Sequence, residues 1–305
     1  MSNKQQLWTE GVLIDFNVRF WSGQKKIKPS EIGVNEDRLP DVIAKLVLCP
    51  NKYVKSFACI RMKGYHAIER VSLSFPVGGA RFVPARAIAN VITELEKYKL
   101  EFDAMVESLL SEYRTLKARC VADYEAQLPR LADYFPTLDD LRTRFSFDWA
   151  FFEFHVPQWS QMNDKFIAEA VVRDEARFQY KQQLQRIVTD FSARAAREMR
   201  ERFLDHLSKI VERVKSGKSI DARQTVGFEL TLDRIEAINI LDDETINKAI
   251  AEVKLELRHG GSYSKDDPAG MQRLAKVLDS AVAVVEDQEG AVKAAERFNR
   301  RIDLE

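Results

Sequence analysis

The sequence predicts a mainly α protein of the α+β kind. Its expected architecture is a long antiparallel helical hairpin or coiled coil, with a small N-terminal α+β head and a helical C-terminal region. Two long stretches free of Gly and Pro carry apolar residues at steps of three and four, as helices do. Near the N-terminus the apolar residues recur instead at every second position, as in a half-buried strand. We therefore expect three consecutive segments, 1–84, 85–220 and 221–305.

The head is predicted from alternation and turn residues. A first strand runs to Trp21, with one face formed by Ile14, Phe16, Val18 and Phe20. Residues 71–75 and 81–83 predict a hairpin around Gly78-Gly79. Residues 29–31 resemble a short helix start, and the apolar run 42–48 fits either a helix or a strand.

The first long helix is expected over residues 85–128. Its apolar positions approach a heptad pattern: Ile88, Val91, Leu95, Tyr98, Phe102, Met105, Leu109, Tyr113, Leu116 and Cys120. Thr137 is expected to cap a short helix, and residues 145–154 to form an aromatic strand.

A second long helix is expected from about Met162 to Lys215, ending at Ser216-Gly217. Because the apolar stripe of such a long helix is narrow, pairing with the first long helix would bury both stripes. Self-association between chains is the competing solution, which the sequence leaves open.

The C-terminal segment is acidic, with 12 basic residues against 18 acidic ones over residues 221–305. We expect a short strand at 227–230, two short helices capped by Thr231 and Asp243, a loop at 260–268, and one final helix from about Ala269 to Arg301.

Composition excludes several classes of protein. The chain is 45% hydrophobic and 10% aromatic, so it is not disordered, and three scattered cysteines make no disulfide framework. No apolar run has the length of a membrane helix, and no secretory signal is visible. Lys plus Arg and Asp plus Glu both number 47, which argues against a dedicated duplex-DNA binder. A cytoplasmic protein, in a bacterial host cell, without membrane contact is expected.

No catalytic motif is visible, and we expect no enzyme activity, no cofactor and no metal. The GKS tripeptide at 217–219 lacks the earlier glycine of a P-loop, because Glu212 stands there, and it follows a helix instead of a strand. The four histidines and three cysteines lie far apart, and no HExxH, CxxC or GxSxG spacing occurs.

Two groups of basic residues are candidates for binding nucleic acid. One follows the aromatic pair Phe20-Trp21, which would suit charge plus base stacking, and the other recurs at helical spacing. The candidates are Lys25, Lys26, Lys28, Arg194, Arg197 and Arg200. Acidic residues are interleaved with the arginines, so a solvated helix flank is the favoured interpretation.

Three blocks of sequence resemble a family of uncharacterised proteins from bacteriophages and integrative elements. They are NVRFWSGQKK at 17–26, VGGARFVP at 77–84 and RFSFDW at 144–149, and the resemblance covers roughly the first 220 residues in order. The family has no established catalytic residues. The resemblance implies a gene neighbourhood with a MoxR-like AAA+ ATPase, a von Willebrand A-domain protein, and recombination and single-strand-binding genes.

The first hypothesis is therefore a non-enzymatic accessory protein that binds protein partners. It would be an adaptor for an AAA+ ATPase module, with the MoxR-like ATPase or the von Willebrand A-domain protein as partner, or a factor that counters host defence. The second is an accessory protein that binds nucleic acid in recombination or inhibits nucleases. The third is an enzyme whose site is assembled from scattered acidic residues.

Overall fold

The computed structural model describes residues 10–27, 44–124, 131–153, 170–260, 263 and 267–302. The chain divides into two compact units, each built from separate stretches of sequence. The first unit comprises 1–15, 68–89 and 151–305, and the second comprises 16–67 and 90–150. The expected division into three consecutive segments stays a prediction.

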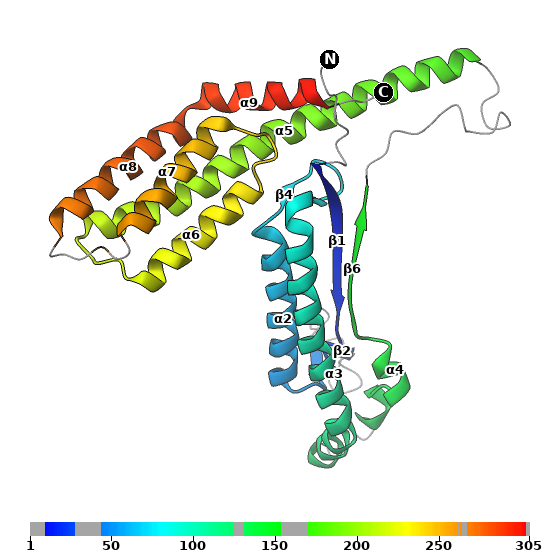
Figure 1. The fold of residues 1–305 in the computed structure, drawn as a ribbon. Helices are drawn as coiled ribbons and strands as arrows, with labels where there is room; N and C mark the ends of the chain where they lie inside the picture. Colours follow the sequence, from blue (N-terminus) through cyan, green and yellow to red (C-terminus); the bar gives the residue numbers. More distant parts are fainter. Residues whose placement is uncertain are drawn as a thin grey trace, which may run out of the picture. The chain divides into compact units, whose positions relative to one another are not determined.

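The described part is mainly helical with a small antiparallel sheet, as the sequence predicts (Figure 1). The strand order is β4-β5-β1-β6, and β1 (Gly11–Arg19) contributes residues to both units. From Ile14 onward its residues alternate between buried and exposed, so the expected period of two is confirmed.

The expected β-hairpin around Gly78-Gly79 is confirmed in the first unit. β4 (Leu73–Ser74) pairs with β5 (Arg81–Pro84), which also pairs with β1 in the register Gly11↔Pro84. Gly78 and Gly79 form the turn with φ of +62° and +69°, a region that side chains rarely adopt.

The rest of the first unit is a group of helices around α5 (Ala170–Lys215), drawn from green to red in Figure 1. The others are α6 (Ala222–Ala237), α7 (Glu244–Gly260), α8 (Pro268–Glu286) and α9 (Gln288–Arg301). α5 packs against α6, α8 and α9, and α7 packs against α6 and α8. Their shared core includes Phe191, Phe203, Leu207, Leu232, Ile250, Leu257, Leu274, Leu278 and Phe298.

Caps set where these helices begin and end. Asp221 and Gln224 form a reciprocal capping box at the start of α6, so the expected strand at 227–230 is wrong. Thr231 lies inside α6 and donates to the Gly227 carbonyl, so it is no cap. Gly217, with φ of +62°, ends α5 as expected.

Inside the first unit the sheet is tied to α5 by a polar cluster. Glu198 accepts from the Ser74 N–H at 2.9 Å and pairs with Arg81 at 3.1 Å and Arg202 at 2.5 Å. Burial by itself would raise the pKa of Glu198, but the Ser74 bond and the two arginine charges outweigh it and lower the pKa. The cluster keeps this carboxylate ionised next to β4 and β5.

The second unit contains α2 (Asn51–Glu69), α3 (Ile88–Tyr124), α4 (Leu138–Arg142), β2 (Gln24–Ile27), β3 (Ala44–Val47) and β6 (Ser146–Phe152). α2 and α3 pack together, with the rings of Phe57 and Phe102 5.2 Å apart and Lys63 paired with Glu101 at 2.7 Å. No helix was predicted at the position of α2. The short helix capped by Thr137 and the aromatic strand are confirmed.

The expected hairpin of the two long helices is not confirmed. The buried stripe of α5 packs against α6, α8 and α9 within the first unit, and α3 packs against α2 within the second. The expected helix start at 29–31 lies outside the described residues.

Candidate protein-binding groove

The first unit contains a buried ion pair between Arg200 of α5 and Asp243 at the start of α7. Arg200 Nη2 lies 2.6 Å from Asp243 Oδ2, and the two side chains are 5% and 2% exposed. The other carboxylate oxygen of Asp243 accepts from the Thr245 N–H at 3.1 Å and the Thr245 hydroxyl at 2.6 Å. Asp243 therefore caps α7, as expected, and also neutralises a buried cation.

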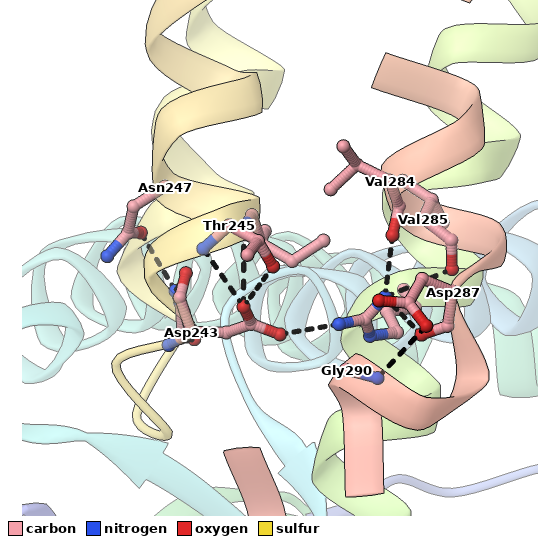
Figure 2. Close-up of polar contacts among 10 residues, drawn as sticks. Asp243, Thr245, Asn247, Val284, Val285, Asp287 and Gly290 are labelled. Carbon is pink, nitrogen blue, oxygen red and sulfur yellow. Dashed lines mark hydrogen bonds and ion pairs between the residues drawn. The ribbon is translucent and has the colours of Figure 1, made fainter. Parts of the chain in front are cut away.

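The same arginine fixes the corner between α8 and α9. Its Nη1 donates to the carbonyl oxygens of Val284 at 2.8 Å, Val285 at 3.2 Å and Asp287 at 3.0 Å. The Asp287 side chain accepts from the Gly290 N–H at 3.1 Å and caps α9 (Figure 2). The sequence predicted one helix here; the structure has two, because the chain turns at Asp287.

Asn239 completes the network on the α7 side. Its side-chain oxygen accepts from the Asp243 N–H at 3.2 Å, and its amide donates to Asn247 Oδ1 at 2.8 Å. Asn239 is 1% exposed. A buried amide with both ends bonded holds the loop before α7 in one conformation.

Next to this network lies a groove between α5 and α9, with a volume of about 510 Å³. We call it the α5–α9 groove. Seven of its sixteen lining residues are apolar, and four of these are alanines: Ala193, Ala196, Leu204, Val285, Ala291, Val292 and Ala295. Val292 is 57% exposed, which is high for a large apolar side chain on a helix that is otherwise well packed.

Charged residues surround this apolar lining. Glu201, Glu286, Glu296 and Arg197 line the groove and are exposed. Two lining residues also hold a buried polar atom without a hydrogen-bond partner among the described residues, Nε of Arg200 and Oδ1 of Asn299. The arrangement is a groove with apolar residues along its floor and charged residues at its edges.

The predicted arginine stripe is not one surface. Arg194 and Arg197 are exposed on α5, but Arg200 is buried and bonded to Asp243 and three carbonyls. The expectation that the three arginines share one exposed face is wrong, because the Arg200 side chain is 5% exposed and paired with Asp243, while nucleic-acid binding by these residues stays a prediction.

Two of the three predicted basic residues near the N-terminus lie within the described part of the chain. Lys25 and Lys26 are exposed on β2, and Lys28 lies outside the described residues. Trp21 is 7% exposed and packs edge-on against Tyr113, while Phe20 stacks on Phe57 with centroids 5.6 Å apart. Trp21, which lies between β1 and β2, is therefore not exposed for base stacking, and nucleic-acid binding by Lys25 and Lys26 stays a prediction.

Burial shifts the pKa of two reactive side chains in the described part, Cys49 and His206. The cysteines are unbridged, and burial raises the pKa of the Cys49 thiol to about 11. Burial lowers the pKa of His206, whose ring contacts the Phe228 carbonyl at 3.2 Å. Within the described residues, no group of three or more His, Cys, Asp or Glu could hold a metal ion.

No described helix is both long and apolar enough to span a bilayer.

The described part is mainly helical, and its first unit has a groove of mixed apolar and charged lining beside a buried polar network. Residues 9–245 match the model of a family described as protein of unknown function (DUF3150). The chain belongs to this family. No curated protein and no solved structure matches it. The match includes Arg200 and Asp243, whereas α9, which forms one wall of the groove, lies beyond it.

Proposed function

We propose that this chain is a non-enzymatic accessory protein of a bacteriophage or mobile element, and that it binds a protein partner in the α5–α9 groove. The observation that carries the proposal is the groove itself, an apolar channel of about 510 Å³ with Val292 57% exposed. Exposed apolar channels with polar edges are typical of protein–protein contact sites.

The resemblance to phage and integrative-element proteins supports the context of the proposal. In that context the partner is a component of an AAA+ ATPase module, such as the MoxR-like ATPase or the von Willebrand A-domain protein. A host defence protein is the alternative partner, and the same groove would serve either.

The environments of the reactive side chains support a non-enzymatic role. Asp243 caps a helix and pairs with a buried arginine, and Cys49 is held as a thiol by its raised pKa. These groups stabilise the fold in their observed positions. Bound metal or turnover of a substrate by the purified chain would contradict this part of the proposal.

The test is affinity purification from cells that carry the parent element, with and without nuclease. Val292→Asp places a charge in the groove, and Leu255→Asp on α7 is its matched control, since Leu255 is also 57% exposed and does not line the groove. We expect a nuclease-resistant partner that Val292→Asp loses and Leu255→Asp retains. Equal recovery with both variants would contradict binding in the groove.

The second candidate function is nucleic-acid binding. Arg194 and Arg197 are both exposed on α5, and Lys25 and Lys26 on β2, which favours it. Phosphate contacts by these residues would give retention of DNA or RNA that falls steeply with salt. A partner lost on nuclease treatment, together with loss of that retention in Arg194→Gln/Arg197→Gln, would support this function instead.

A further inference from the structure

The edges of the α5–α9 groove carry an excess of acidic side chains. Glu201 on α5, Glu286 at the end of α8 and Glu296 on α9 line it and are exposed, against one exposed basic residue, Arg197. Among the described residues no cation lies within ion-pair distance of these three carboxylates. By contrast, nearby Glu289 on α9 pairs with Lys293 at 2.6 Å and does not line the groove.

The positive charge at the base of the groove does not offset this excess. Arg200 also lines the groove, but its charge is neutralised by Asp243 at 2.6 Å. A bound segment therefore encounters a net negative surface around an apolar channel. Such a surface favours a partner with basic residues and repels phosphate backbones.

The lining also restricts the shape of the occupant. Ala193 and Ala196 on α5 and Ala291 and Ala295 on α9 line the groove, and all of them except Ala193 are buried, so short side chains form its floor. At 1.5 Å per residue, the 14 residues of α9 extend over roughly 20 Å, which matches about four turns of a helix laid alongside. Short side chains in the floor leave room that the larger apolar side chains of a bound helix would fill.

We propose that the α5–α9 groove takes an amphipathic helix of a protein partner, with an apolar stripe at i, i+3, i+4 and i+7 and Lys or Arg on its flanks. This inference rests on the proposed function and adds the chemistry of the partner. Glu201 on one wall and Glu286 and Glu296 on the other pair with the basic flanks. Val292 and Leu204 contact the apolar stripe.

Fluorescence anisotropy with labelled model peptides tests the charge preference on the full chain. The first peptide is an 18-residue amphipathic helix of Leu, Ala and Lys, and the second replaces every Lys with Glu. We expect the chain to bind the Lys peptide at least tenfold more tightly than the Glu peptide at low salt, with a difference that shrinks as NaCl rises.

A charge reversal assigns the binding to the groove. Glu201→Lys/Glu286→Lys/Glu296→Lys should weaken the Lys peptide about tenfold and strengthen the Glu peptide. Asp205→Lys/Glu252→Lys/Asp279→Lys is the matched control, since these acids are exposed and lie outside the groove lining. Circular dichroism of both triple variants establishes that each remains folded.

Equal binding of the two peptides, or equal weakening by both triple variants, would overturn the inference.

Val292→Asp distinguishes failure of this inference from failure of the proposed function. If the Glu peptide or both peptides bind and Val292→Asp abolishes binding, the groove takes helices but not basic ones. If neither peptide binds, the basic-helix inference is wrong, and the proposed function is judged by the partner recovered from cells. Binding of a second copy of the chain would appear as a dimer that Val292→Asp dissolves, which also overturns the inference.

Discussion

At the scale of single residues, Arg200 shows what spacing in a sequence can and cannot determine. Arg194, Arg197 and Arg200 follow each other at steps of three, which suggests one face. Because an α-helix turns about 100° per residue, each such step falls roughly 60° short of a full turn. Arg200 is therefore rotated by about 120° from Arg194, enough to move it from the exposed side to the core.

Removing the negative charge of Asp243 should destabilise the fold. We expect Asp243→Asn, which keeps an oxygen for the helix cap, to lower the free energy of unfolding by about 3–5 kcal/mol, because it leaves the Arg200 charge buried and unpaired. Urea unfolding followed by circular dichroism measures this change. Arg197→Met, at an exposed position, should change it by less than about 0.5 kcal/mol.

A double variant identifies the source of the loss. Arg200→Met in the Asp243→Asn background removes the unpaired charge, so the double variant should lose less stability than the two single changes added together. Strict additivity would show that the two side chains do not act as a pair.

His206 should make stability depend on pH. Its folded pKa is lowered by burial, so the folded state binds fewer protons than the unfolded state. The contribution is fully present above the unfolded pKa of about 6.5 and falls as pH drops toward the lower folded value. We expect the free energy of unfolding to fall between about pH 7.5 and pH 5.5, and His206→Gln to flatten that slope.

Glu198 affects the free energy of unfolding in a separate, more acidic pH range, because the pKa of its carboxylate is lowered from 4.5. Its contribution is present above that value and is lost at lower pH. A slope above pH 5.5 that His206→Gln leaves unchanged would contradict the assignment to His206.

At the scale of helices and strands, local signals predicted the elements that local chemistry controls. The alternation in β1, the Thr137 cap and the Gly217 stop involve residues within a few positions of each other, and all three are confirmed. The start of α6 was wrongly expected at a Thr231 cap, although the signal for its true start is present, an Asp221-x-x-Gln224 capping box. Gly64 lies inside α2, although glycine is a weak helix former. The Phe16 ring packs so close to it that a larger side chain would clash, which the sequence does not reveal.

Two helical glycines give a matched test of that packing. A Cβ at Gly64 in α2 would lie 2.4 Å from the Phe16 ring, whereas one at Gly227 in α6 would meet nothing within 4 Å. Gly64→Ala should therefore destabilise the chain by about 1–3 kcal/mol through overpacking. Gly227→Ala should stabilise it by about 0.5–1 kcal/mol through helix propensity. Thermal unfolding measures both, and a stabilised Gly64→Ala would contradict the close contact.

At the scale of the whole molecule, the pairing of elements distant in sequence could not be predicted. The apolar stripe of α5 fits any partner of suitable shape, and the sequence favoured the other long helix. In the structure α6, α8 and α9 cover it, helped by Arg200, which bonds to residues 43 to 87 positions away. Burial by a bundle and burial by a hairpin leave the same periodic pattern in the sequence.

The candidate site could be predicted only in part for the same reason. Arg194 and Arg197 were correctly expected on a helix surface, but the groove requires the turn at Asp287 that separates α9 from α8. The sequence signal for that turn is weak. It consists of Asp287, whose side chain accepts from the Gly290 N–H, and many other acidic residues of this segment could serve equally well as a helix cap.

Photo-crosslinking in cells tests most directly whether the α5–α9 groove is where a protein partner binds. A photoreactive phenylalanine analogue at Val292 lies in the groove, and the same analogue at Leu255 is equally exposed outside it. We predict a nuclease-resistant crosslink to one protein from Val292 and none to that protein from Leu255. The same crosslinks from both positions, or crosslinks only from Leu255, would contradict the groove as the binding site.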